Sequence, residues 1–290
     1  MSSVLVTGQN GAMSFRVAGL QTAGTLRDVA ANLRELEQAA EEAARNGTDL
    51  LITPEMFVTG YVVGDALPEL AALDFLAAVK SLAARLGIGI VLGGPELADG
   101  GVYNAAYFID DCGAVLNVYR KSHLFGELDR RQFLAGDELF GLVSFRGVRV
   151  ATMICYDVEF PEVVRSAALA GAHLVAVPTA QMEPFSFVAE QLVRARAWEN
   201  QLYVAYVDHD GSEEGLRYVG RSSIVAPDAT VLDSVERGNR LIYATIDPEI
   251  VAAQQSANPY LWDRRAPLYP ALSDEYNGLR DSSASAADAL

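Results

Sequence analysis

The segment Thr152–Glu162, TMICYDVEFPE, contains the features that decide the fold and the chemistry of this chain. An apolar run ends at Cys155, and Pro161 then suits the first turn of a helix. A buried strand that delivers one reactive residue just before a helix is typical of α/β proteins. Asp157 and Glu159 follow closely, and like charge disfavours a thiolate. A catalytic Cys155 therefore needs another group to activate it.

Outward from this segment, apolar strands alternate with amphipathic helices, and hairpins are inserted between them. The pattern predicts an α/β domain with mixed parallel and antiparallel sheets over residues 15–270, an N-terminal extension over 1–14 and a C-terminal tail over 271–290. The predicted helices cover residues 25–46, 70–86, 161–170 and 185–201. The predicted strands cover residues 15–22, 48–55, 88–94, 102–110, 114–121, 173–179, 202–208, 220–227 and 230–235, with a further hairpin over 142–155.

Composition narrows the function classes. The 290 residues are 51% hydrophobic and carry a net charge of -16, which disfavours nucleic acid or an anionic membrane as a partner. The two cysteines predict no disulfide framework, and the three histidines lie in separate segments without metal-ligand spacing. No secretory leader or long apolar span is evident, so we expect a cytoplasmic protein without metal or cofactor.

Three apolar strands each end in a chemically reactive residue: LLITPE at Glu55, LNVYRK at Lys121 and VATMIC at Cys155. Ligands of α/β sheets bind outside the carboxyl ends of the strands, so these residues converge if their strands are neighbours. A carboxylate at Glu55 would take the thiol proton as Cys155 attacks a carbonyl carbon. Lys121 and the backbone N–H of Tyr156 would stabilise the resulting oxyanion.

Each of these residues also has a purely structural reading. Cys155 alone reads as an inert buried cysteine, Glu55 as an acid in a turn, and Lys121 as an exposed strand end. His123 lies two residues from Lys121, but we interpret it as structural because Lys and Glu already supply the chemistry. Cys112 falls in a polar hairpin turn, IDDCGAV, and reads as incidental.

Three motifs in this order resemble the nitrilase superfamily, the carbon–nitrogen hydrolases: PEMFVTGY, YRKSHLFGELD and ICYDVEFPE. The later segments GAHLVAVPTA, RARAWENQLYV, GRSSIVAPDA and DRRAPLY extend the resemblance over roughly residues 15–269. It implies a four-layer αββα sandwich, assembly into a homodimer or larger homo-oligomer, and no cofactor. It gives Glu55 the base role, Lys121 the oxyanion role and Cys155 the nucleophile role, with Glu127 as a second glutamate that positions substrate.

The tripeptide Cys-Tyr-Asp at residues 155–157 is similar to the amidase branches, whereas true nitrilases usually carry Cys-Trp-Glu. The runs KSHLFGELDRRQF and ICYDVEFPE are most similar to bacterial amidases of the 5-aminopentanamidase type. This resemblance implies hydrolysis of a small aliphatic amide, including an ω-amino amide, through a cysteine thioester. One departure is His173, which stands where the family usually has an acid.

Residues close to the motifs are expected to bind the amide substrate: Tyr61, Tyr156, Asp157, Glu159, Thr179 and Glu183. A substrate ammonium would need a facing carboxylate, for which Asp65, Asp157, Glu159 and Glu183 are open candidates. The rival functions are those of an ω-amidase, an N-carbamoyl amine or amino-acid hydrolase, or a nitrilase. Outside this class, a catalytically silent scaffold or a redox protein that pairs Cys112 with Cys155 remains open.

Overall fold

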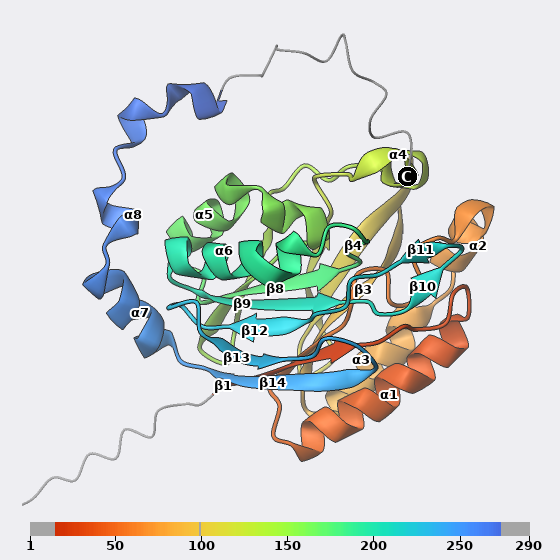
Figure 1. The fold of residues 1–290 in the computed structure, drawn as a ribbon. Coiled ribbons are helices and arrows are strands. Elements are labelled where there is room, and N and C mark those ends of the chain that lie inside the picture. The colour runs from red at the N-terminus through yellow and green to blue at the C-terminus, as the bar shows by residue number, and fades with distance from the viewer. Residues whose placement is uncertain (1–14, 99, 274–290) are drawn as a thin grey trace, which may run out of the picture.

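The computed structural model, which describes residues 15–98 and 100–273, contains two six-stranded mixed sheets packed face to face (Figure 1). The first sheet has the order β14-β1-β2-β3-β4-β5. In it β1, β2 and β3 are parallel, while β14 and β4 are antiparallel to their neighbours. Its strands are β1 Phe15–Gln21, β2 Leu50–Ile52, β3 Gly89–Ala98, β4 Gly101–Ile109, β5 Val115–Arg120 and β14 Arg240–Ile246.

The second sheet has the order β13-β12-β9-β8-β7-β6, with β7, β8 and β9 parallel at its centre. Its strands are β6 Gly141–Phe145, β7 Val148–Thr152, β8 Leu174–Thr179, β9 Tyr203–Asp208, β12 Ser223–Val225 and β13 Val231–Ser234. A separate small hairpin joins β10 Ser212–Glu213 to β11 Leu216–Arg217. The mixed pairing confirms the predicted α/β class with mixed sheets.

Helices cover the outer face of each sheet, so the layers run helix, sheet, sheet, helix (Figure 1). On one side, α1 Val29–Arg45 and α3 Phe75–Leu86 share an apolar core with the first sheet. On the other, α5 Pro161–Leu169 and α6 Val193–Asn200 share a larger core with both sheets. Central strands buried on both faces read as continuous apolar runs in the sequence, as LVAV does in β8.

The helix boundaries follow local capping chemistry. Asp28 caps α1 by accepting the N–H of Ala31, so the helix begins later than the predicted Thr25. The predicted helix over 70–86 is two helices, α2 Leu67–Ala71 and α3, because Asp74 caps a new start. The predicted helix over 185–201 begins with the π-helical turn Val188–Leu192 and continues as α6.

The following elements were not predicted from the sequence: α4 Gly126–Gln132, α7 Pro248–Ala257, α8 Tyr260–Asp263, β10, β11 and β14. The predicted N-terminal extension lies outside the described residues, as does the predicted tail beyond residue 273. Within the described part of the chain, no helix is both long enough and apolar enough to cross a bilayer.

Candidate active site

Cys155 lies at a sharp turn between β7 and α5. Its backbone has φ +45°, in the left-handed region that costs energy for any residue other than glycine. The buried carboxylate of Asp157 holds this turn, because Oδ2 accepts the N–H of Ile154 at 3.0 Å and the hydroxyl of Tyr119 at 2.8 Å. The turn therefore fixes the Cys155 side chain in a buried position, where 7% of the residue is exposed.

Glu55 follows β2, and its main chain is held from both sides. Its N–H donates to the carbonyl of Thr179 at 3.2 Å, and its own carbonyl accepts from Nε2 of His209 at 2.6 Å. A Cβ added to Gly93 would lie 2.0 Å from the Pro54 carbonyl, so only glycine lets β3 pass this closely. These contacts place the Glu55 carboxylate inside the molecule, where 1% of the residue is exposed.

Lys121 directly follows β5 and is completely buried between two carboxylates. Its Nζ lies 2.8 Å from Oε1 of Glu55 and 2.8 Å from Oδ2 of Asp129. Glu55 Oε1 also accepts from the Asn104 side chain at 2.7 Å. Glu55 Oε2 has no hydrogen-bond partner among the described residues, so one carboxylate oxygen remains free to take a proton.

The three strand ends converge. Their convergence was expected from the sequence only if the three strands were neighbours, and they are not. β2 and β5 lie in the first sheet with β3 and β4 between them, and β7 lies in the second sheet. β5 is antiparallel to β4, which is antiparallel to β3, so β5 runs parallel to β2 and ends at the same edge. Face-to-face packing of the sheets then brings Cys155 to that edge.

The electrostatics favour a protonated thiol beside a basic carboxylate. Burial raises the pKa of Cys155 well above its ordinary value, and Glu55 raises it further despite the opposing effect of Lys121. Burial also raises the pKa of Glu55 above its usual range, although Lys121 lowers it. Burial lowers the pKa of Lys121, but Asp129 and Glu55 outweigh that effect, so the pKa is raised and the ammonium remains charged.

The acid that contacts Lys121 is Asp129. Glu127, which is predicted to position substrate, forms no ion pair with Lys121 within the described part of the chain and lines the larger of two spaces at this edge of the sheets. Glu127 is half exposed and lies near Arg130 at 3.7 Å and Arg131 at 3.8 Å. Asp129 is fully buried, and it contacts Lys121 and also hydrogen-bonds to the Tyr61 hydroxyl. Two residues apart on a helix point about 200° apart, so only one acid of GELD can face inward. The sequence contains both acids without showing which one does.

We expect Asp129→Asn to lower kcat about 10²-fold or more, because the Lys121 ammonium loses one of its two carboxylate partners and shifts in the site. The matched variant Glu127→Gln makes the same chemical change on a half-exposed acid and should stay within about threefold of wild type. Steady-state ammonia release measures both variants. A large loss in Glu127→Gln with little in Asp129→Asn would restore the assignment from the sequence.

Some of the predicted substrate-binding residues line the catalytic pocket, whereas others are engaged in hydrogen bonds within the protein. Tyr61, Tyr156 and Glu159 line the pocket that contains Cys155 and Lys121. Both carboxylate oxygens of Asp157 already accept hydrogen bonds from the protein, including one from the N–H of His123. The Thr179 hydroxyl donates to the carbonyl of Val177. Thr179 therefore contributes to the site through its backbone carbonyl, which accepts the N–H of Glu55.

Two connected spaces lie at this edge of the sheets. A catalytic pocket of about 10 Å³ is lined by Tyr61, Lys121, Phe125, Cys155, Tyr156, Glu159, Ala180, Gln181 and Met182. A larger hollow of about 590 Å³ shares Tyr61, Phe125, Tyr156 and Met182 with it. Glu183 lines this outer hollow, and its carboxylate pairs with Arg237 at 3.0 Å. Asp65 lies in an exposed turn and lines neither space.

Sequence reasoning missed Asp129, Asn104, Gln181 and His209 as residues of this site. Gln181 lies near the Cys155 sulfur, with 3.8 Å between Sγ and Oε1. His209 must donate from Nε2, because its partner is a backbone carbonyl, and this sets its tautomer. Nδ1 of His123 lies 2.7 Å from Oδ1 of Asp157, and the His123 ring stacks on the ring of Phe160. These contacts agree with a structural role for this histidine.

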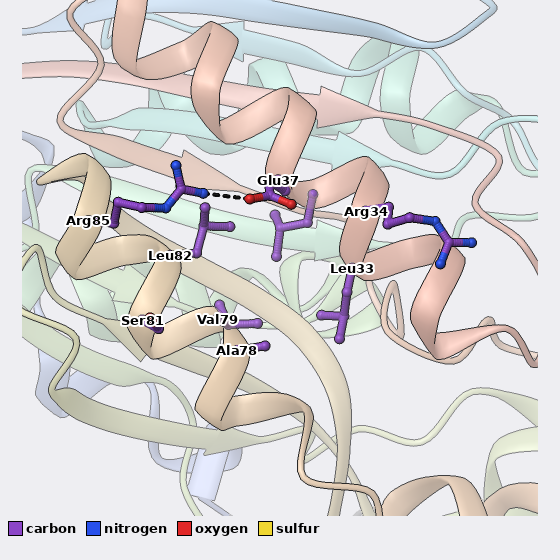
Figure 2. Close-up of a pocket in the computed structure, with 9 residues that line it drawn as sticks. Leu33, Arg34, Glu37, Ala78, Val79, Ser81, Leu82 and Arg85 are labelled. Carbon is purple, nitrogen blue, oxygen red and sulfur yellow. Dashed lines mark hydrogen bonds and ion pairs between the residues drawn. The ribbon is translucent and has the colours of Figure 1, made fainter.

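Another pocket, of about 260 Å³, lies between α1 and α3, the helices that cover the outer face of the first sheet (Figure 2). Its walls are mainly aliphatic, with Leu33, Val79 and Leu82 among them. Its carboxylate, Glu37, is engaged with Arg85 at 2.6 Å, as the dashed line in Figure 2 shows. The described residues that line this pocket include no cysteine, lysine or histidine.

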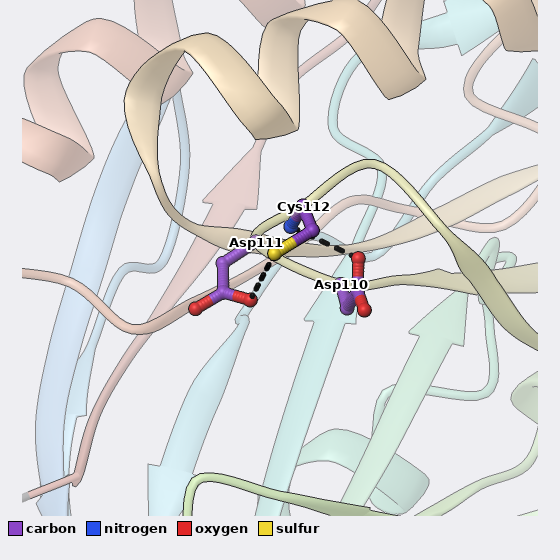
Figure 3. Close-up of side chains that lie close together, drawn as sticks. All are labelled: Asp110, Asp111 and Cys112. Atoms are coloured by element: carbon purple, nitrogen blue, oxygen red, sulfur yellow. Dashed lines mark hydrogen bonds between the residues drawn. The ribbon is translucent and has the colours of Figure 1, made fainter.

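Asp110, Asp111 and Cys112 lie close together in the turn between β4 and β5 (Figure 3). Asp110 accepts the N–H groups of Cys112 and Ala114, and Asp111 pairs with Arg146 at 2.6 Å. This turn lies at the opposite end of β5 from Lys121, roughly 20 Å away for a six-residue strand. Cys112 is therefore too far from Cys155 for a disulfide, which argues against the redox reading.

An αββα sandwich with a buried cysteine, lysine and glutamate at one sheet edge defines a class of cysteine-dependent carbon–nitrogen hydrolases. Residues 16–255 match the model of the Carbon-nitrogen hydrolase family, and the chain belongs to that family. It is an amidase-type enzyme of the nitrilase superfamily, which acts on carbon–nitrogen bonds other than peptide bonds. The predicted superfamily and enzyme class are thereby confirmed.

The chain is similar over most of its length to proteins that are named hydrolase or amidase. It is 46% identical to the "Hydrolase in pqqF 5'region" of Pseudomonas protegens, covering 91% of this chain and 94% of that protein. It is 34% identical to an "(R)-stereoselective amidase" of Pseudomonas sp., covering 92% and 97%. An amidase structure from Nesterenkonia sp. superposes with a TM-score of 0.80 at 33% identity, covering 89% of this chain and 96% of that one.

Proposed function

We propose that this enzyme hydrolyses the primary carboxamide of a small aliphatic acid to the carboxylate and ammonia. The observation that carries the proposal is the Oε2 atom of Glu55, which has no hydrogen-bond partner among the described residues, on a carboxylate whose other oxygen is bound by Lys121 and near the buried Cys155 thiol, whose pKa burial raises. Related amidase structures from Nesterenkonia sp. AN1 hold acrylamide or butyramide, and in another the acetamide moiety of fluoroacetamide has added covalently at the active-site cysteine.

The proposed reaction has two halves. Glu55 takes the proton of the Cys155 thiol as sulfur attacks the amide carbon, and Lys121 with the Tyr156 N–H stabilises the oxyanion. The C–N bond then breaks, and Glu55 returns the proton to the departing ammonia. Glu55 next deprotonates a water that attacks the thioester, and the C–S bond breaks to release the acid and regenerate the thiol.

The experiment that tests this proposal measures ammonia release from a panel of amides, nitriles and carbamoyl compounds. The proposal predicts turnover of acetamide and butyramide with one ammonia per carboxylate formed. Turnover of carbamoyl compounds alone, with CO₂ formed beside ammonia, would instead support the N-carbamoyl hydrolase. Turnover of nitriles alone would support a nitrilase. No turnover by a folded protein would support a silent scaffold.

An ω-amino amide is the narrower form of this proposal, and Glu159 is the residue that supports it. Of the four candidate carboxylates, Glu159 alone lines the catalytic pocket. No ion pair to its side chain occurs within residues 15–98 and 100–273. Burial raises the pKa of Glu159 to about 7, although Lys121 and Arg196 lower it. A substrate ammonium would give this carboxylate a direct ionic partner in addition to the more distant charges of Lys121 and Arg196.

We expect Glu159→Gln to lower the preference for 5-aminopentanamide over pentanamide about tenfold. A carboxyl with a raised pKa is charged only above that pKa, so the wild-type preference should fall as the pH drops through about 7. The substrate amine stays protonated across this range. Glu183→Gln is the matched control, because Arg237 already pairs with that carboxylate. A preference in Glu159→Gln that equals that of wild type and still falls as the pH drops through about 7 would exclude Glu159 as the ammonium site.

Assembly into a homodimer or larger homo-oligomer stays a prediction. Several large apolar side chains on the outer faces of α5, α6 and the C-terminal segment are exposed, which is consistent with a covered surface: Leu169, Trp198, Tyr260, Trp262 and Leu268.

A further inference from the structure

The catalytic pocket is too small for more than the reacting group. Its volume of about 10 Å³ is close to the space that one water needs. The adjoining hollow of about 590 Å³ has the size usual for a small-molecule site. Because the proposed leaving group is ammonia, every carbon of the substrate belongs to the acyl part. Any acyl group beyond the first atoms must therefore extend into the hollow.

Aromatic and aliphatic side chains form the walls of this hollow. The Phe125 ring meets the Tyr156 ring edge-on at 5.2 Å between centroids and the Phe185 ring at 5.7 Å. Val62, Leu128, Met182 and Leu216 contribute further apolar surface. Rings arranged edge to face in this way favour an apolar or aromatic guest.

The charged groups of the hollow are already neutralised. Glu127 lies near Arg130, and Glu183 is paired with Arg237. The carboxylate of Asp129 is bound by Lys121 and Tyr61 and is fully buried. A guest with its own charge would find no unpaired counter-charge among these wall residues, so the charge of an ω-amino chain is matched only where that chain turns back to Glu159, which lines the catalytic pocket and not the hollow.

We propose that this hollow is an acyl-binding subsite for an uncharged apolar group, such as a branched alkyl chain or a phenyl ring. The inference rests on the proposed function and names its substrate class: carboxamides whose acyl group carries a bulky apolar end. Each CH₂ added along the series acetamide, butyramide, hexanamide should raise kcat/KM about two- to fourfold, because it leaves water for an apolar wall. 4-Phenylbutanamide should exceed butyramide by about tenfold or more.

The variant Leu216→Trp tests the hollow without touching the catalytic groups, since Leu216 lines only the outer space. We expect it to lower kcat/KM for 4-phenylbutanamide about tenfold and to leave acetamide within about twofold of wild type. Phe185→Ala is the complementary variant and should lower the preference for the phenyl group. Equal kcat/KM across the series, or an equal loss on all substrates in Leu216→Trp, would overturn the proposal.

A binding measurement separates this proposal from the proposed function. In the Cys155→Ala background, calorimetry should show 4-phenylbutanamide binding at least about tenfold more tightly than acetamide, and Leu216→Trp should remove the difference. If wild type turns over acetamide and butyramide but the phenyl compound gains no affinity, the hollow is not an acyl subsite and the amidase proposal stands. If no amide is turned over but the phenyl compound still binds through Leu216, the amidase proposal fails and the apolar subsite stands.

Discussion

Cys155→Ala should lower amide turnover by at least about 10⁴-fold, because the proposed mechanism forms its covalent intermediate on this sulfur. The substitution removes a single atom from a turn that Asp157 and Tyr119 hold independently, so the fold should persist. Steady-state ammonia release from butyramide, together with a thermal unfolding curve, measures both effects.

Cys112→Ala is the matched control for this variant. Cys112 is exposed in the β4–β5 turn, and Asp111 and Asp110 raise the pKa of its thiol. Its removal should leave turnover within about twofold of wild type. Wild-type turnover in folded Cys155→Ala would show that Cys155 is not the nucleophile. A loss of turnover in Cys112→Ala would indicate that the Cys112 thiol takes part in the reaction.

The second large effect is expected for Glu55→Gln, which keeps the size of the side chain but removes its basicity. Turnover should fall about 10²- to 10⁴-fold, the usual range for the loss of a general acid–base group. The Lys121 ammonium keeps its contact to Asp129, so this variant should fold. Retained turnover in Glu55→Gln would show that another group carries the proton.

The pH profile gives an independent check of Glu55. Burial raises the pKa of this carboxyl, so its basic form is lost at a higher pH than for an ordinary glutamate, whose value is 4.5. As the pH is lowered, the kcat/KM of the wild-type enzyme should therefore begin to fall at a pH above 4.5, the ordinary pKa of a glutamate. Glu55→Gln should not show this decrease. Glu127→Gln, with the same chemical change outside the catalytic pocket, should retain it.

The sequence was sufficient to predict the sheet strands that carry the site. The apolar runs ending at Glu55, Lys121 and Cys155 correspond to β2, β5 and β7. β2 is buried and apolar throughout, whereas β5 is an edge strand in which only Tyr119 is buried, so its run is only partly apolar. The small elements were harder to predict: the four residues of β10 and β11 have no periodicity to read. The break between α2 and α3 depends on Asp74, and a capping aspartate looks like any other polar helix residue in the sequence.

The residues of the site that were predictable close a strand or lie in one of the motifs around those strand ends, as Tyr61, Tyr156 and Glu159 do. Asp129 and His209 reach Glu55 and Lys121 through tertiary packing, from a short helix and from the end of β9. The sequence separation of 154 between His209 and Glu55 leaves no local signal. Asp157 shows the reverse case: it lies in the nucleophile motif, yet its carboxylate accepts hydrogen bonds from Ile154 and Tyr119 to hold the turn.

The most direct test of the account is whether an acyl group passes through Cys155. Wild-type enzyme would be given butyramide with increasing hydroxylamine, a nucleophile similar in size to the departing ammonia. The account predicts that butyrohydroxamate forms at the expense of butyrate while ammonia release continues, and that Cys155→Ala forms neither product. Ammonia and butyrate formation by wild type without hydroxamate at any hydroxylamine concentration would contradict it, because water would then attack the amide directly.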